Sequence, residues 1–250
     1  AIHKKDGRVT NLGYGMSKLN LEPEYARILI AGFNYGVLDK ISELCAMLEI
    51  GEMNNFLLEL SPKDSKDKNK KKQFSKLRDS WKSDSDHISM INIYQAYKSQ
   101  EDKVAFCKKY HFHHKNFSKI ADQAEEFKNQ VERLHKREQK FREGEYLYRK
   151  DIMFKDNSEK TKILAALSEG LFINLFKRHG FNYLTCFPKK EEMASIGKRS
   201  LIKGKINTGI YTQFNSIFGF TVFDMVSKLP DKIINYIKKT KSKYFDRCLL

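Results

Sequence analysis

The apolar residues of this chain change their spacing near residue 145, and this change constrains the fold more than any other feature. Upstream they recur every three or four residues, which is typical of helices that bury one face. The clearest stripe consists of Phe117, Ile120, Ala121, Ala124, Phe127 and Val131. Beyond Gly180 the chain has short β-favouring runs separated by glycines, at 183–187, 193–196, 206–214 and 217–223. These runs favour a small barrel, so the fold class is predicted to be α+β.

Helix starts and turns divide the first part of the chain further. Asp6 and Gly7 form a favoured hairpin turn, followed by the β-favouring Val9 and Thr10. Helices are predicted to begin with Pro23 in the first turn, near Asp39 as a plausible N-cap, and at Asp86 as an N-cap, and helical patterns follow at 104–110 and 117–134. Residues 163–176 are strongly apolar and fit either a helix or a strand, and a last amphipathic helix is predicted over 230–237.

Residues 61–86 form a polar segment with eight lysines, one arginine and five aspartates. It is predicted to be a loop that Phe74, Leu77 and Trp81 anchor. The lysines at 70–72 could contact phosphates, or they could be solvated without a fixed partner.

The net charge of +16 indicates a polyanionic partner. Nucleic acid is the first candidate, an acidic membrane surface the second and an acidic protein the third. The alternative is a lysine-rich composition without such a partner. The longest apolar runs are too short to cross a membrane, and no signal peptide is visible. The four cysteines are far apart, which indicates a reducing, intracellular compartment, cytoplasmic or nuclear.

No catalytic motif is present in the sequence. Two Gly-Lys pairs, at 197–198 and 204–205, lack the earlier glycine of a phosphate-binding loop, and there is no DEAH tetrapeptide. We therefore expect no catalytic residue and no cofactor in this chain. Cys107, His111, His113 and His114 could be read as zinc ligands, but packed histidines or histidines that face RNA are the preferred interpretation, so no metal is expected.

Several blocks resemble the C-terminal region of DEAH-box RNA helicases, in the same order. Residues 9–17 (VTNLGYGMS) and 26–30 (ARILI) resemble a hairpin and the helix after it. Four further blocks resemble the family at 39–48, 86–97 (DHISMINIYQAY), 106–107 and 165–174. The resemblance weakens at 195–200, 211–214 and 226–230, which indicates a divergent member, possible in a large DNA virus; the compartment would then be the host cytoplasm.

The resemblance implies a domain order. Residues 1–22 would be the end of a winged helix with its wing hairpin, residues 23–150 a helical, ratchet-like domain that contains the basic loop 61–86, and residues 151–250 an OB-fold with a C-terminal helix. The implied function is to close a channel over single-stranded RNA, while RecA-like motor domains with ATP and Mg²⁺ lie elsewhere in a longer parent protein.

The resemblance also implies where RNA would bind. Lys198, Arg199, Ser200, Lys203 and Lys205 form a basic loop on the barrel, and Lys115 and Lys119 lie on a helix of the ratchet-like domain. The alternative reading is a module that docks an activator protein or clamps the motor domains. A nuclease is a third functional class, but no group of carboxylates or histidines with a recognisable spacing supports it.

Overall fold

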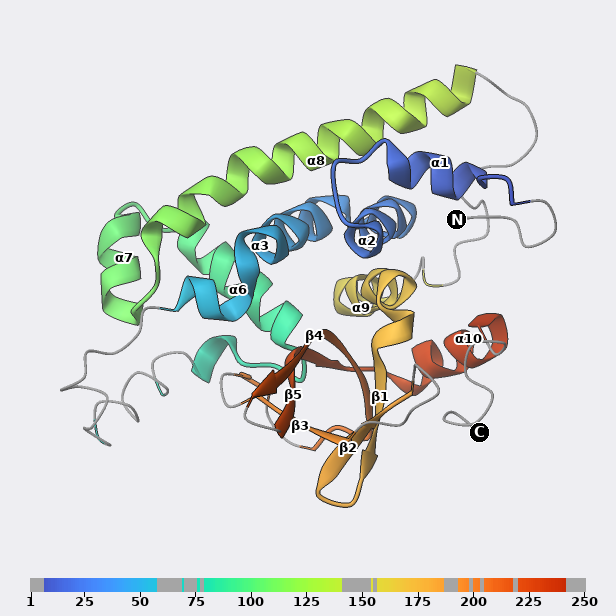
Figure 1. Ribbon diagram of the computed structural model, residues 1–250. Coiled ribbons are helices and arrows are strands. Elements are labelled where there is room, and N and C mark those ends of the chain that lie inside the picture. Colours follow the sequence, from blue (N-terminus) through green and yellow to red (C-terminus); the bar gives the residue numbers. More distant parts are fainter. Residues whose placement is uncertain are drawn as a thin grey trace.

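A computed structural model describes residues 7–57, 69, 76, 79–140, 154, 157–186, 193–197, 200–202, 205–217 and 220–241. A helical part is followed by a barrel, with further helices between and after them (Figure 1). The helices are α1 (Asn11–Ser17), α2 (Pro23–Asn34), α3 (Leu38–Phe56), α6 (Asp86–Lys98), α7 (Lys103–Tyr110), α8 (His114–Lys140), α9 (Glu159–Gly170) and α10 (Asp231–Lys241), with short 3₁₀ turns at Asp79–Trp81 (η1) and Phe172–Asn174 (η2).

The helix starts agree with the sequence except in one detail. Pro23 is in the first turn of α2, as predicted. The N-cap of α6 is Ser85, whose hydroxyl accepts the Ile88 N–H, and not the predicted Asp86. Asp86 is the first helical residue, and its carboxylate turns toward the barrel instead.

The described part of the N-terminal segment is helical where we expected a hairpin. Residues 11–17 form α1, because Thr10 caps the helix by accepting the Gly13 N–H at 3.0 Å. Gly13 and Gly15 are buried, which places α1 close to its neighbours. Gly7 has φ 69, as a turn requires, but Asp6 lies outside the described residues.

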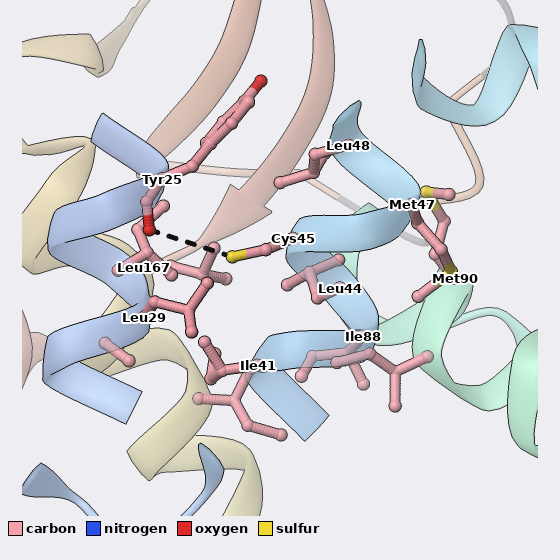
Figure 2. Packing of buried hydrophobic residues seen from close by; sticks show 14 of the residues in the cluster. Tyr25, Leu29, Ile41, Leu44, Cys45, Met47, Leu48, Ile88, Met90 and Leu167 are labelled. Carbon is pink, nitrogen blue, oxygen red and sulfur yellow. Dashed lines mark hydrogen bonds between the residues drawn. The ribbon is translucent and has the colours of Figure 1, made fainter. Parts of the chain in front are cut away.

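The core of the helical part forms where α2, α3, α6 and α9 meet (Figure 2). Cys45 on α3 lies against α2, with its thiol 3.9 Å from the Tyr25 carbonyl. Gly170 at the end of α9 lies directly on α2, since an added Cβ would be 2.4 Å from the Glu24 carbonyl oxygen. Any larger residue at position 170 would push these two helices apart.

An aromatic cluster anchors the end of the lysine-rich segment. The Trp81 ring packs against Tyr110 at 4.7 Å, Phe106 at 5.7 Å and Phe112 at 6.2 Å between ring centroids. Leu57, before the segment, forms a β-bridge with Phe112. The flanks of the segment therefore reach the same cluster. The predicted anchors Phe74 and Leu77, and the lysines at 70–72, lie outside the described residues.

The barrel consists of β1 (Leu175–His179), β2 (Asn182–Thr185), β3 (Met193–Ile196), β4 (Thr208–Ile217) and β5 (Phe220–Lys228). It closes in the order β1-β2-β3-β5-β4, with β3 and β5 parallel and the other pairs antiparallel. Its interior is filled by Phe176, Ala194, Ile206, Tyr211, Phe223 and Val226. The α+β class is confirmed, and the barrel shape fits an OB-fold.

A buried ion pair joins α10 to the helical part. Glu169 on α9 receives the Arg27 guanidinium of α2 at 2.5 Å and the Tyr236 hydroxyl of α10 at 2.7 Å. Burial raises the pKa of Glu169, but Arg27, Lys241 and the Tyr236 hydroxyl together outweigh burial and hold it below its ordinary value. The carboxylate therefore stays ionised between three helices.

Candidate nucleic-acid interface

Asp86, at the start of α6, holds the predicted RNA-binding loop of the barrel against the helical part. Its side chain is 1% exposed and accepts three hydrogen bonds from the barrel. The donors are the Leu201 N–H at 2.7 Å, the Ser200 hydroxyl at 2.8 Å and the Val226 N–H at 3.0 Å. One carboxylate therefore ties the loop at 200–201 and strand β5 to the start of α6.

His87 adds further contacts between the start of α6 and the barrel, and the contacts of Asp86 and His87 together are called the joint below. Its ring is fully buried, with Nδ1 2.6 Å from the Ser227 hydroxyl of β5 and Nε2 2.7 Å from the Thr212 hydroxyl of β4. The Ser227 hydroxyl also lies 2.6 Å from that of Ser85. A serine beside a histidine can be a nucleophilic pair, but this one is sealed from substrate and holds two domains together instead.

The backbone of β5 bends at the joint. Met225 has φ 50, a region that residues with a side chain seldom occupy. The next residue, Val226, donates its N–H to Asp86. The strained residue thus directly precedes the donor that the buried carboxylate needs.

Burial shifts the two ionisable groups of the joint in opposite directions. It raises the pKa of Asp86 to about 6, although hydrogen bonds from Val226, Ser200 and Leu201 oppose that rise. It lowers the pKa of His87 to about 3, so that the ring is neutral at physiological pH. A neutral ring has one donor and one acceptor nitrogen, which suits the two hydroxyls beside it.

The predicted barrel patch is only partly visible. Lys205 is exposed just before β4, and Ser200 is half-buried with its hydroxyl on Asp86. Lys198, Arg199 and Lys203 lie outside the described residues. Among the described members, Lys205 has a free surface for a phosphate, whereas the Ser200 hydroxyl already has an acceptor.

Lys115 and Lys119 lie one turn apart in the first turns of α8, and both are exposed. Phe117, between them in sequence, is buried in the core. Two contacts hold this end of α8 on the end of α3: the His113 N–H donates to the Phe56 carbonyl at 3.0 Å, and the Asn116 amide donates to the Asn55 carbonyl at 2.6 Å. The structure therefore places the two predicted lysines on one solvent-facing surface.

Two further lysines beside this surface were missed by sequence reasoning. Lys108 and Lys109 are exposed in the last turn of α7, directly before α8, and α8 has no acidic residue in its first turn. Their signal was the pair of adjacent lysines between Cys107 and Lys115, which the sequence analysis did not consider. These four lysines, 108, 109, 115 and 119, are called the α7–α8 surface below.

Zinc is not supported at the Cys–His cluster. Helix α7 ends at Tyr110, and His111 has φ 55, so Cys107 and His111 do not share a helix face. Within the described residues no group of three or more His, Cys, Asp or Glu side chains could hold a metal ion. In the same part of the chain, every helix is too short or too polar to span a bilayer.

Comparisons with known proteins connect this geometry to a family. Residues 22–90 match the family model of the helicase-associated domain (HA2), ratchet-like. A stretch of 126 residues is 25% identical to the protein named "Probable ATP-dependent RNA helicase DHX35" from Pongo abelii, which covers 50% of this chain and 16% of that protein. The match thus spans about a sixth of the length of that relative.

These matches fall mainly in the helical part. Residues 22–90 are similar to the ratchet-like helicase-associated domain (HA2). This domain includes α2, α3 and the start of α6, with Asp86 and His87 near its end. The match supports the predicted ratchet-like domain over that range.

Replacing Asp86 with Ala tests the joint. The variant loses three hydrogen bonds and leaves two backbone N–H groups, those of Leu201 and Val226, without their buried acceptor. We expect the free energy of unfolding in urea to fall by about 3–5 kcal/mol. The control is Asp102→Ala, which removes one exposed helix cap on the Ala105 N–H and should cost about 1 kcal/mol. Equal losses of stability in Asp86→Ala and Asp102→Ala would contradict the role given to Asp86.

Replacing His87 with Gln tests the buried ring through pH. In the native protein the pKa of His87 is depressed, so its contribution to stability is complete above about pH 6.5 and is lost as the pH falls toward 3. Asp86 has a raised pKa, so its effect on the free energy of unfolding changes with pH in the opposite direction, between about pH 6 and 3.8. Gln does not titrate, and Asp86 is common to both proteins. The stability advantage of the native protein should therefore shrink below pH 6.5, by up to about 1.4 kcal/mol per pH unit. If urea unfolding gives the same stability difference between the native protein and His87→Gln at every pH from 7.5 to 5, the His87 ring is not buried as described.

Proposed function

We propose that this chain is the single-stranded RNA-binding accessory region of an ATP-dependent DEAH-box RNA helicase. The observation that carries the proposal is the combination of a ratchet-like helicase-associated domain at 22–90 with a closed five-stranded barrel fixed to it. The barrel is proposed to be an OB-fold, and residues 1–22 the end of a winged helix. In this proposal the helical part and the barrel form one wall of a channel that encloses the RNA strand.

Exposed basic side chains would give the wall its affinity. The α7–α8 surface offers four lysines for phosphate oxygens, and Lys205 offers one from the barrel. Lysine is a point charge that does not discriminate between bases, so these contacts would hold any sequence and let the strand slide. Lys198, Arg199 and Lys203 are proposed to extend the barrel contact, whereas the Ser200 hydroxyl already donates to Asp86.

The chemistry of ATP hydrolysis is proposed for other parts of a longer protein. No residue of this chain matches a phosphate-binding loop, so RecA-like motor domains would bind ATP and Mg²⁺ and move against this wall. An activator protein is a further proposed partner. The proposed compartment is the cytoplasm or the nucleus, or the host cytoplasm for a viral protein. Buried thiols at Cys45 and Cys107, neither of which forms a disulfide, support a reducing environment.

A salt titration of single-stranded RNA binding tests the proposal. Each lysine that contacts a phosphate releases counterions, so the slope of log affinity against log salt should fall by about 0.7 per lost contact. Lys115→Ala with Lys119→Ala should therefore lower the slope by about 1.4. Replacing Lys198, Arg199, Lys203 and Lys205 together should lower it further.

The matched control removes the same charge elsewhere. Lys238 and Lys239 are exposed on α10, and changing both to Ala should leave the slope nearly unchanged. If this pair and the Lys115 and Lys119 pair have equal effects, binding follows net charge alone and the proposed surface fails. If the chain binds RNA negligibly but binds a protein partner without salt dependence, the docking-module reading replaces the RNA reading.

A further inference from the structure

The β1–β2 hairpin ends in an aromatic side chain that nothing covers. His179 pairs with Asn182, which leaves Gly180 and Phe181 as a two-residue turn. Gly180 has φ 59, the conformation that favours glycine at the first position of such a turn. Phe181 follows it and is 101% exposed, the highest value among the exposed large hydrophobic residues described.

Hydrogen bonds and ring packing hold the base of the turn in place. The Arg178 Nε–H donates to the Gly180 carbonyl at 3.0 Å, and the Arg178 N–H donates to the Asn207 carbonyl at 2.8 Å. Tyr183, which pairs with Arg178 across the strands, packs its ring against the interior Phe176 at 5.2 Å. The backbone of the turn that carries Phe181 is thus braced, which limits the ordering that a ligand would have to impose on it.

The outward surface of the β1–β2 hairpin carries basic and apolar side chains. Strand register places Lys177 opposite Leu184 and Leu184 opposite Met193, so these three form a row across β1, β2 and β3. Lys177 is exposed and Met193 is 60% exposed. Residues 175–186 contain no Asp or Glu at all. A hairpin that carries both an exposed ring and an exposed lysine suits a ligand that has flat π faces and negative charge, which is the chemistry of a single-stranded nucleic acid.

We propose that the β1–β2 hairpin is a second RNA contact, in which Phe181 stacks on an unpaired base and Lys177 meets the adjacent phosphate. This inference rests on the proposed RNA function but lies outside its surface. In Figure 1 the hairpin projects from the barrel on the side away from α8, whereas the α7–α8 surface lies at the far end of the helical bundle. An RNA strand that contacts both the α7–α8 surface and the hairpin would run across the molecule. The hairpin would then bind the RNA where it leaves the proposed channel wall.

Stacking and phosphate contacts have different signatures, which makes the hairpin testable by itself. Phe181→Ala removes a stacking ring and no charge. We expect the affinity for an unstructured single-stranded RNA of about 12 nucleotides to fall about tenfold, with the salt slope unchanged. The matched control is Tyr14→Ala, because Tyr14 is 55% exposed on α1 and should have no effect on affinity.

A direct readout comes from Phe181→Trp. An indole stacked on a base is quenched, so the fluorescence of this variant should fall with RNA and saturate at the measured affinity. The native protein, with Trp81 packed in its aromatic cluster, supplies the background. Urea unfolding of both variants should match the native protein, since Phe181 contributes no buried surface.

The failures of the two proposals can be told apart. If the native chain binds RNA with the expected salt slope but Phe181→Ala binds equally well and Phe181→Trp is not quenched, the hairpin inference alone is overturned. If sedimentation instead shows a native dimer that Phe181→Ala disperses, with RNA affinity unchanged, the exposed ring pairs two copies of the chain. If no RNA binds at physiological salt, both proposals fail.

Discussion

The burial of Asp86 and His87 is the constraint on which the rest of the structure depends. Two adjacent polar residues at the start of α6 are enclosed by the barrel, and each must find partners there because water cannot reach it. Asp86 finds donors in the loop at 200–201 and in β5, and His87 finds hydroxyls in β4 and β5. Such directional contacts fix the orientation of the barrel on the helical domain in a way that apolar packing alone would not. Glu169 does the same for α10, since it accepts the Tyr236 hydroxyl while it pairs with Arg27 of α2.

Much of the fold follows from local patterns. The stripe from Phe117 to Val131 predicts α8 because its apolar spacing matches a helix, and the glycine-separated runs predict β2 to β5. They do not predict β1, which begins near the end of the apolar segment 163–176. Local patterns fail where long-range contacts decide. Asp86 reads as a cap because carboxylates favour helix starts, yet its partners are more than 100 residues away. Residues 9–17 contain two glycines and a β-favouring flank, yet the Thr10 cap and close packing make them helical.

The candidate site shows the same division. Lys115 and Lys119 could be predicted from a family resemblance, and the structure places both on one exposed surface. Lys108 and Lys109 become visible only when α7 and α8 are seen end to end. Phe181 could not be selected from sequence, because eighteen phenylalanines look alike until burial separates them. Conversely, Ser200 stands in a basic loop but supports the joint, so a residue beside a site is not necessarily part of it.

The central claim is that single-stranded RNA lies along particular described surfaces of this chain. Photo-cross-linking with thiouridine-substituted single-stranded RNA, followed by mass spectrometry of the peptides, tests it most directly. The account predicts that cross-links concentrate in the peptides around Lys115 to Lys119 and around Phe181, and that excess unlabelled RNA abolishes them. Cross-links that scatter in proportion to exposed lysines, with α10 labelled as strongly as α8, would contradict it.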